Sequence, residues 1–209
     1  MTNIVHNLIE GEANGDSFGH AVSLSSDGSI VAISAPNNEG DLTSASSPLG
    51  TITNDTNIYY QTAGNSDWST AAPNASDYLP SHLKKGINPG SVKIYKNNGS
   101  EWVQLGSEIK GNQLWDQKGI SLSLSGDGKT LVVGNPLSVY SYPNVCVYSL
   151  VNNDWSQIAH IESGSSFDYF GYSTSLSSDG KTLAVGGFYG ELGTATDNAG
   201  YVKIYENVN

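Results

Sequence analysis

Apolar and polar residues alternate with a period of two in many short runs, and turn residues separate one run from the next. Such alternation is typical of strands that bury one face. An Asp-Gly pair lies between the first two runs of each group, where glycine supplies the positive φ that a tight hairpin needs. The pairs are at 27–28, 127–128 and 179–180. The pattern predicts an all-β protein built from antiparallel hairpins.

Three segments of the chain resemble one another, so the hairpins belong to an internal repeat. The segments are 16–33, 116–133 and 168–185. Each is followed by a third alternating run, and the first two repeats add a fourth run that begins at Trp102 or Trp155. Repeated units of four antiparallel strands are typical of β-propeller blades. We therefore predict a β-propeller-type repeat of three four-stranded antiparallel blades.

The whole chain is predicted to form a single β-propeller-like domain, 1–209. Its predicted parts are a closing strand at 2–11, blade 1 at 12–111 with an insertion loop at about 37–90, blade 2 at 112–164 and blade 3 at 165–209. The third repeat stops at Asn209 without a fourth strand, and the apolar spacing of residues 2–11 matches the fourth strand of the first repeat. The N-terminal strand is therefore predicted to complete the last blade.

This closure can occur within one chain or between two chains. Because propellers usually contain about four to eight blades, we favour a six-bladed homodimer in which two copies exchange their N-terminal strands. A compact monomer of three sheets is one alternative. A larger assembly in which neighbouring chains accept the strand is another.

The repeats resemble the FG-GAP type of β-propeller repeat found in integrin α chains and in many surface proteins. The resemblance rests on Phe18-Gly19, Phe170-Gly171 and Ala35-Pro36, while the second repeat has Lys118 in place of phenylalanine. It implies a propeller fold. The calcium loop of that family is missing, because Ser25-Ser26-Asp27-Gly28 supplies one carboxylate whereas Ca²⁺ takes about six to eight oxygen ligands. Calcium dependence is therefore not expected.

The composition is strongly acidic, with 9 basic and 20 acidic residues and a formal net charge of −11. Nucleic-acid binding needs a concentrated basic surface, so we expect no nucleic-acid partner. No run is long and apolar enough to span a bilayer, and the N-terminus lacks the pattern of a signal peptide, so we expect no membrane insertion. Cys146 is the only cysteine and is expected to be a small buried apolar residue.

Six aspartates recur at equivalent positions and are predicted to be structural turn residues that accept backbone N–H bonds. They are Asp16, Asp116, Asp168, Asp27, Asp127 and Asp179. The alternative is a ring of carboxylates that binds a cation or assists hydrolysis, but acid–base catalysis requires two carboxylates in different environments. No nucleophile–base, phosphate-loop or zinc motif is present. We therefore predict no catalytic residue, no metal ligand and no cofactor.

The insertion at about 37–90 lies between the second and third strands of the first repeat. It is rich in Asn, Ser, Thr and Gly and also contains several aromatic residues, a mixture that adaptable recognition loops use. The predicted ligand-binding residues are Tyr59, Tyr60, Trp68, Tyr78, His82 and Lys84. The alternative is that the aromatic side chains cover a blade edge or fill the centre of the ring.

These features predict a non-catalytic recognition or assembly module and not an enzyme. The expected partners are a second copy of the chain and a glycan or protein that the 37–90 loop contacts, on a virion or cell surface. A glycoside-hydrolase-like enzyme with carboxylates near the ring axis is one alternative. A purely structural scaffold, whose long loop packs against its own blades, is another.

Overall fold

The described part of the chain is made of strands and turns. The computed structural model describes residues 8–38, 89–111, 116–137, 142–165, 168–189 and 199–208, and the backbone of 60–61 and 68–69. These residues contain no helix. The prediction of an all-β protein is therefore confirmed. Contacts divide the chain into two compact units, residues 1–40 with 86–209 and residues 41–85.

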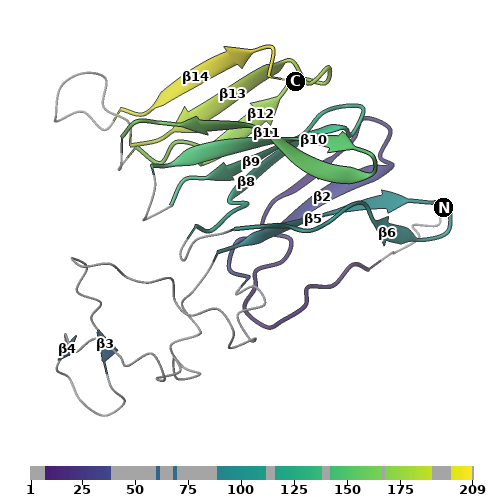
Figure 1. Ribbon diagram of the computed structural model, residues 1–209, viewed down its shortest axis with the longest axis horizontal. Helices are drawn as coiled ribbons and strands as arrows, with labels where there is room; N and C mark the ends of the chain where they lie inside the picture. The colour runs from purple at the N-terminus through teal and green to yellow at the C-terminus, as the bar shows by residue number, and fades with distance from the viewer. Residues whose placement is uncertain are drawn as a thin grey trace, which may run out of the picture. The chain divides into compact units, whose positions relative to one another are not determined.

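The first unit contains three antiparallel sheets, one for each repeat (Figure 1). The first sheet contains β1 (Val22–Leu24), β2 (Ile30–Ala35), β5 (Ser91–Asn97), β6 (Trp102–Gln104) and β7 (Ile109–Lys110). The second sheet contains β8 (Ser121–Leu124), β9 (Thr130–Asn135), β10 (Asn144–Val151) and β11 (Asp154–Glu162). The third sheet contains β12 (Ser173–Leu176), β13 (Thr182–Gly187) and β14 (Tyr201–Glu206).

In the second and third sheets, strands that follow one another along the chain lie side by side. The second sheet has the predicted four strands in the order β8-β9-β10-β11. In the first sheet the predicted fourth strand is divided into β6 and β7, which both pair with β5. Gly106 lies between them with φ of 76°, a left-handed conformation that a strand does not continue through.

The predicted closing strand at 2–11 is described only in part. Residues 8–11 form no strand, and Gly11 lies against the Phe18 side chain of the first repeat. Residues 2–7 lie outside the described residues. Among the described residues, the outer edge of β14 has no paired strand. Completion of the third sheet by the N-terminal strand therefore stays a prediction.

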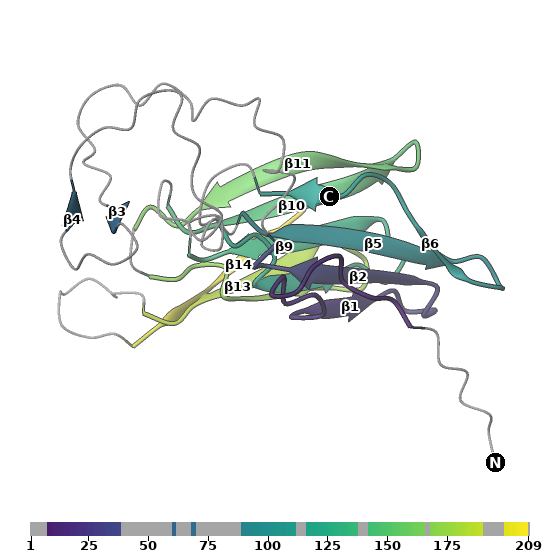
Figure 2. The ribbon, with the colours of Figure 1, turned by 90° about the horizontal axis from the view of Figure 1, so that it is seen from below.

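The second sheet lies between the first and third sheets (Figures 1 and 2). One core cluster joins the first and second sheets and includes Ile94 of β5 and Leu131 of β9. A separate cluster joins the second and third sheets and includes Val147 of β10 and Leu183 of β13. Both faces of the second sheet are therefore covered by protein, and this burial of apolar surface holds the stack of sheets together.

The innermost strands β1, β8 and β12 bring their hairpin turns together. The Ser26 N–H donates to the Gly126 carbonyl at 2.9 Å, and the Gly126 N–H donates to the Ser178 carbonyl at 2.8 Å. The hydroxyl oxygens of Ser26 and Ser178 are 3.3 Å apart. A Cβ atom on residue 126 would run into both hydroxyls, so a glycine is required between them.

The second unit contains a short two-stranded antiparallel sheet among its described residues. It is formed by β3 (Tyr60–Gln61) and β4 (Trp68–Ser69). Tyr60 pairs with Ser69, and Gln61 pairs with Trp68.

Candidate functional site

Each sheet of the first unit has two faces whose residues recur in the three repeats. We name as the front face the one that carries the leucine at the end of the innermost strand, which is Leu24, Leu124 or Leu176. The back face carries the second apolar residue of the third strand, which is Ile94, Val147 or Ile204. The front face of the second sheet packs on the back face of the first sheet. In the same way, the front face of the third sheet packs on the back face of the second.

The front face of the first sheet and the back face of the third are not covered by any other described sheet. Leu24 is 58% exposed, whereas Leu124 at the same position of the second sheet is 6% exposed. Ile204 is 67% exposed, and Val202 beside it is also exposed, whereas the equivalent Val147 is fully buried. The two ends of the stack thus expose the kind of apolar residue that the stack buries inside.

One charged side chain of the open front face is neutralised within the first repeat. Lys93 is mostly buried and forms an ion pair with Glu12. Burial lowers the pKa of Lys93, but the hydrogen bond with Glu12 and the charge of Glu108 outweigh burial and raise the pKa above its ordinary value. The lysine is therefore charged at neutral pH, and its charge is balanced on this face.

The two closed junctions share a hydrogen bond between sheets. The Leu124 N–H donates to the Ser23 hydroxyl at 2.9 Å, across the first junction. The Leu176 N–H donates to the Ser123 hydroxyl at 2.8 Å, across the second. The hydroxyl thereby satisfies a backbone N–H that belongs to the free edge of an innermost strand. The two junctions thus share this polar contact.

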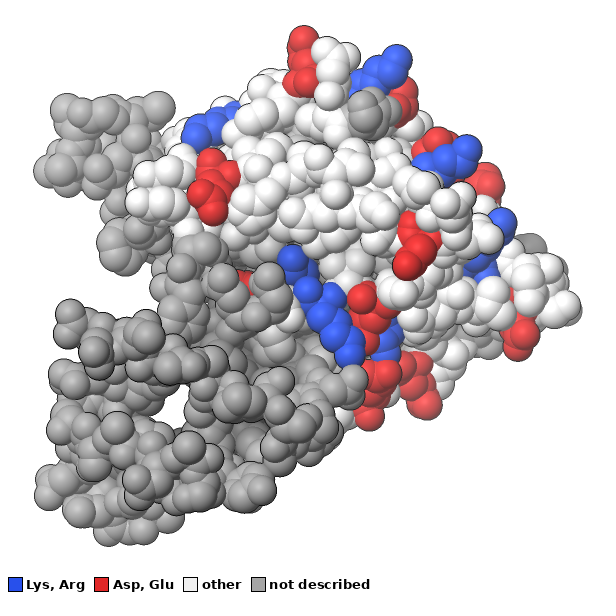
Figure 3. All heavy atoms as spheres, in the orientation of Figure 1, with Lys and Arg blue, Asp and Glu red and all other residues white. Residues whose placement is uncertain are grey.

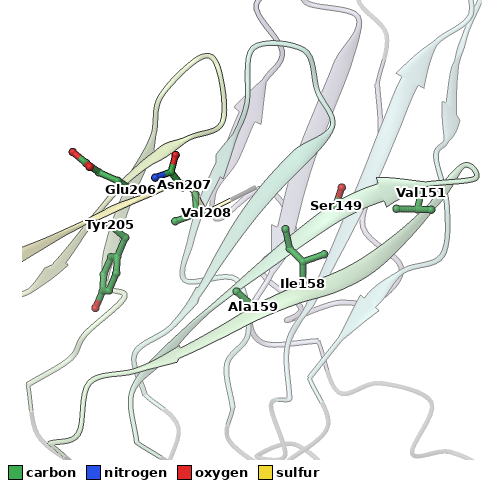
Figure 4. A pocket seen from close by; sticks show the side chains of 8 residues that line it. All are labelled: Ser149, Val151, Ile158, Ala159, Tyr205, Glu206, Asn207 and Val208. Atoms are coloured by element: carbon green, nitrogen blue, oxygen red, sulfur yellow. The ribbon is translucent and has the colours of Figure 1, made fainter.

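A groove of about 600 Å³ lies between the second and third sheets, at the end of β14 (Figure 4). Ile158 and Ala159 of β11 form one wall, and Tyr205 and Val208 form part of the other (Figure 4). Ser149, Val151, Glu206 and Asn207 also line it.

The equivalent space at the junction of the first and second sheets is filled by Trp155. The Trp155 Nε1–H donates to the Leu105 carbonyl at 3.0 Å, and the ring lies against Gly106. Leu105 is the repeat equivalent of Ile158. The groove therefore lies beside the unpaired edge of β14, at the place that the Trp155 ring occupies in the first junction.

The predicted ligand-binding residues all lie in the second unit. Pairing of β3 with β4 brings the backbones of Tyr60 and Trp68 onto neighbouring strands. Tyr59, Tyr78, His82 and Lys84 lie outside the described residues. The structure thus places two of the six predicted residues together and describes the backbone of these two alone.

The aspartates of the Asp-Gly turns are bound by groups of their own turns. Asp27 accepts the Ser25 hydroxyl at 2.6 Å and the Ser29 N–H at 2.9 Å. These hydrogen bonds lower the pKa of Asp27 to about 2, and the bond from the Ser25 hydroxyl has the largest effect. Asp127 and Asp179 accept the same pair of local donors, and the pKa of each is also below its ordinary value.

The other three repeated aspartates are buried at the start of each repeat. Asp16 accepts the Ala13 N–H at 3.2 Å and the Asn38 side-chain amide at 3.1 Å. Asp168 accepts the Phe170 N–H at 3.1 Å and the Tyr201 hydroxyl. Burial and this last hydrogen bond raise the pKa of Tyr201 well above its ordinary value. The carboxylates of Asp16 and Asp168 thus accept hydrogen bonds from groups of their own repeats.

A polar cluster lies inside the first junction. Cys146 is buried there, as expected, but its neighbours are polar: the Lys118 amine is 3.9 Å from the thiol, and His160 Nδ1 is 3.5 Å from it. The Lys118 amine also donates to the Tyr148 hydroxyl at 3.2 Å. Burial raises the pKa of both the Cys146 thiol and the Tyr148 hydroxyl. A buried, protonated thiol is not a nucleophile.

An aromatic cluster specific to the third repeat lies beside its back face. Tyr169, Tyr172, Phe188 and Tyr189 form it, with ring centroids 4.5 to 5.3 Å apart, and the last three rings are half-exposed. Sequence reasoning did not single out this cluster. A comparison of the repeats could have found it, because the equivalent positions hold Ser, His, Pro and Asn in the first repeat.

Charges are mixed on the face of the molecule seen in Figure 3. Lysines and acidic side chains are interspersed there, with a broad area that carries no charged residue. Within the described ranges, no group of three or more His, Cys, Asp or Glu side chains is arranged to hold a metal ion. No helix among these residues is long and apolar enough to cross a membrane.

No protein-family model matches the chain, and no curated protein matches it.

Proposed function

We propose that the protein is a non-catalytic recognition or assembly module of the β-propeller type. Its blades associate with further blades through the two open sheet faces, and the segment at about 37–90 binds the ligand. The observation that carries the proposal is the contrast between equivalent residues, with Leu24 and Ile204 exposed where Leu124 and Val147 are buried. Exposed apolar faces of this kind mark contact with another protein surface.

The repeated junction supports the propeller arrangement. Front face packs on back face twice, with the same inter-sheet hydrogen bond, so the two junctions repeat one packing arrangement. A rotation applied repeatedly about one line generates a ring, which is how propellers place their blades. The FG-GAP type without its calcium loops is the arrangement that we propose.

A fourth strand beside β14 completes the third blade in this proposal. The unpaired edge of β14 and the groove of about 600 Å³ beside it provide its place. Residues 2–11 are the proposed strand, added from the same chain or from a second copy. Covering this edge also removes a template for unwanted strand pairing.

The recognition role belongs to the second unit. Tyr59, Tyr60, Trp68, Tyr78, His82 and Lys84 are the proposed contact residues. Aromatic rings with neighbouring amide and hydroxyl groups suit both glycans and protein surfaces. We propose a glycan or protein ligand, met on a virion or cell surface.

An enzymatic role as a glycoside hydrolase has less support. That chemistry needs two carboxylates about 5 to 10 Å apart, one of them with a raised pKa. The repeated aspartates accept local hydrogen bonds, and those in the Asp-Gly turns have lowered pKa values. The buried Cys146 thiol is not a substitute nucleophile.

Binding to a glycan array and to an array of surface proteins tests the proposal. The triple variant Tyr59→Ala, Tyr60→Ala, Trp68→Ala is expected to lose the binding that the wild type shows. Tyr142→Ala, which removes an exposed aromatic ring of the first unit, is the matched control and is expected to bind normally. Absence of wild-type binding, or binding that survives the triple change, would contradict the proposal. Release of reducing sugar from bound glycan would favour the hydrolase.

A further inference from the structure

We infer that a second copy of this chain covers both open faces. The front face of the first sheet in one copy packs on the back face of the third sheet in the other copy. This inference rests on the proposed function, because it names the partner of the faces through which the module associates. It follows from three features of the closed junctions. The open faces carry the equivalent residues of each feature, but there these residues contact no other described sheet.

The first feature is apolar complementarity. At the second junction Leu176 of the front face shares a core cluster with Val147 of the back face. The equivalent residues at the open faces are Leu24 and Ile204, and both are largely exposed. The open front and the open back are thus the two halves of a junction that the chain already forms twice within itself.

The second feature is the hydrogen bond between sheets. At the second junction the Leu176 N–H donates to the Ser123 hydroxyl at 2.8 Å. The equivalent groups are the Leu24 N–H and the Ser175 hydroxyl. Neither has a hydrogen-bond partner within the described residues, and the Leu24 N–H points away from β2 because the Ser25 N–H is the one that bonds back to Ile30. Front-to-back docking joins this donor to this acceptor.

The third feature is the shape of the front face. Gly119 and Gly171 are closely approached by the preceding sheet: an ideal Cβ on them would lie 2.7 Å from Ser34 Cβ and 2.8 Å from the Asn144 carbonyl oxygen. The equivalent Gly19 also has a positive φ, 89°, and nothing lies within 4 Å of its ideal Cβ. The front face of the first sheet therefore has space beside Gly19 for the close approach of a back face.

Two copies are enough to use all four open faces. Each copy contributes three sheets, and a ring of six lies within the range of about four to eight blades that propellers show. Three copies would make nine sheets and exceed it. The two junctions in such a dimer are identical and related by a two-fold axis. The pairing is front on back, so a dimer made of two front faces is excluded by the inference.

Light scattering after size exclusion tests the inference on the full chain. Wild type is expected at twice the chain mass of 22.1 kDa. Leu24→Glu and Ile204→Glu are each expected to run as a monomer, because either change places a charge in both junctions. Val103→Glu, at an exposed apolar residue of β6 on neither open face, is the matched control and is expected to remain a dimer. Far-ultraviolet circular dichroism checks that each variant is folded. If a glutamate variant does not fold, Leu24→Ser or Ile204→Ser is used in its place.

Mixing the two monomeric variants gives the sharpest result. Leu24→Glu keeps an intact back face and Ile204→Glu keeps an intact front face, so an equimolar mixture is expected to form a pair with one junction. A wild type that is monomeric, a mixture that stays monomeric, or an Ile204→Glu variant that dimerises alone through its front faces overturns the inference. None of these outcomes alters the array result, on which the proposed function is judged.

Discussion

The second sheet and the two outer sheets carry similar residues at equivalent positions, but the burial of these residues differs. Both faces of the second sheet are covered by neighbouring sheets, whereas the first and third sheets each have one face that no described sheet covers. Leu124 and Leu24 occupy the same repeat position, yet the first is buried and the second is exposed. The comparison teaches that the repeat sets the chemistry of a face, while the neighbour sets whether that chemistry stabilises the chain.

The largest difference is expected between Leu124→Ala and Leu24→Ala. Leu124 lies in a core cluster, so its truncation is expected to lower the free energy of unfolding by about 2–5 kcal/mol. Leu24→Ala removes exposed atoms and is expected to cost less than about 1 kcal/mol. Urea unfolding in the Ile204→Glu background, which keeps single chains, measures both. Equal losses would show that the two faces are covered alike.

A smaller difference is expected between Ser123→Ala and Ser175→Ala. The Ser123 change leaves the Leu176 N–H without its acceptor at a closed junction, at a cost of roughly 1–3 kcal/mol. The equivalent Ser175 hydroxyl has no partner in the described part of a single chain, so its loss is expected to be close to neutral. The same urea titration decides this. A clear loss in Ser175→Ala within single chains would mean that another group already uses that hydroxyl.

The smallest effects are expected at the Asp-Gly turns, where middle and outer sheets have the same chemistry. The pKa of Asp27 is about 2 in the folded chain, below its ordinary value of 3.8, so its charge stabilises the fold above pH 4, roughly, and this contribution is lost as pH falls toward about 2. Asp27→Asn is therefore expected to lower the melting temperature at neutral pH and to flatten its fall over that acid range. Asp127→Asn and Asp179→Asn are expected to show the same direction, because the pKa of each is also lowered. Thermal melts across that pH range test this, and a steeper acid loss in Asp27→Asn would contradict it.

Much of the fold could be predicted from alternation and turns, because strand faces and hairpins depend on local residues. The division of the fourth strand could not, since it depends on Gly106 meeting the Trp155 ring of the next repeat. Which faces are open could not be predicted either. Leu24 and Leu124 are the same residue at the same repeat position, and the neighbouring sheet decides their exposure.

The departures of the second repeat have a physical reason that sequence reasoning missed. In the third repeat the Lys203 amine lies 5.3 Å from the centre of the Phe170 ring. In the second repeat lysine stands at the phenylalanine position, as Lys118, and cysteine stands at the lysine position, as Cys146. The lysine of the second repeat thus lies in the turn before β8 instead of on the third strand, and it has an aromatic partner in Tyr148. Comparing the repeats at both positions, the one of Phe170 and Lys118 and the one of Lys203 and Cys146, would have revealed this exchange.

The predicted ligand-binding site stays a prediction. The six ligand residues were chosen from the composition of the 37–90 segment, and the structure describes the backbone of two of them. The open faces and the groove at β14 were not chosen, because their apolar residues are indistinguishable in sequence from the core. Only the three-dimensional order of the sheets separates an interface from an interior.

The two open faces of the chain are different surfaces, and this difference affects how many copies an assembly can contain. When a surface binds a different surface on the next copy, its chemistry sets no upper limit on the number of copies, and only the angle between sheets closes the ring. A substitution that changes this angle would turn a closed particle into a filament. The net charge of −11 opposes such growth, and salt screens that repulsion beyond about 8–10 Å. Ionic strength would then govern filament length.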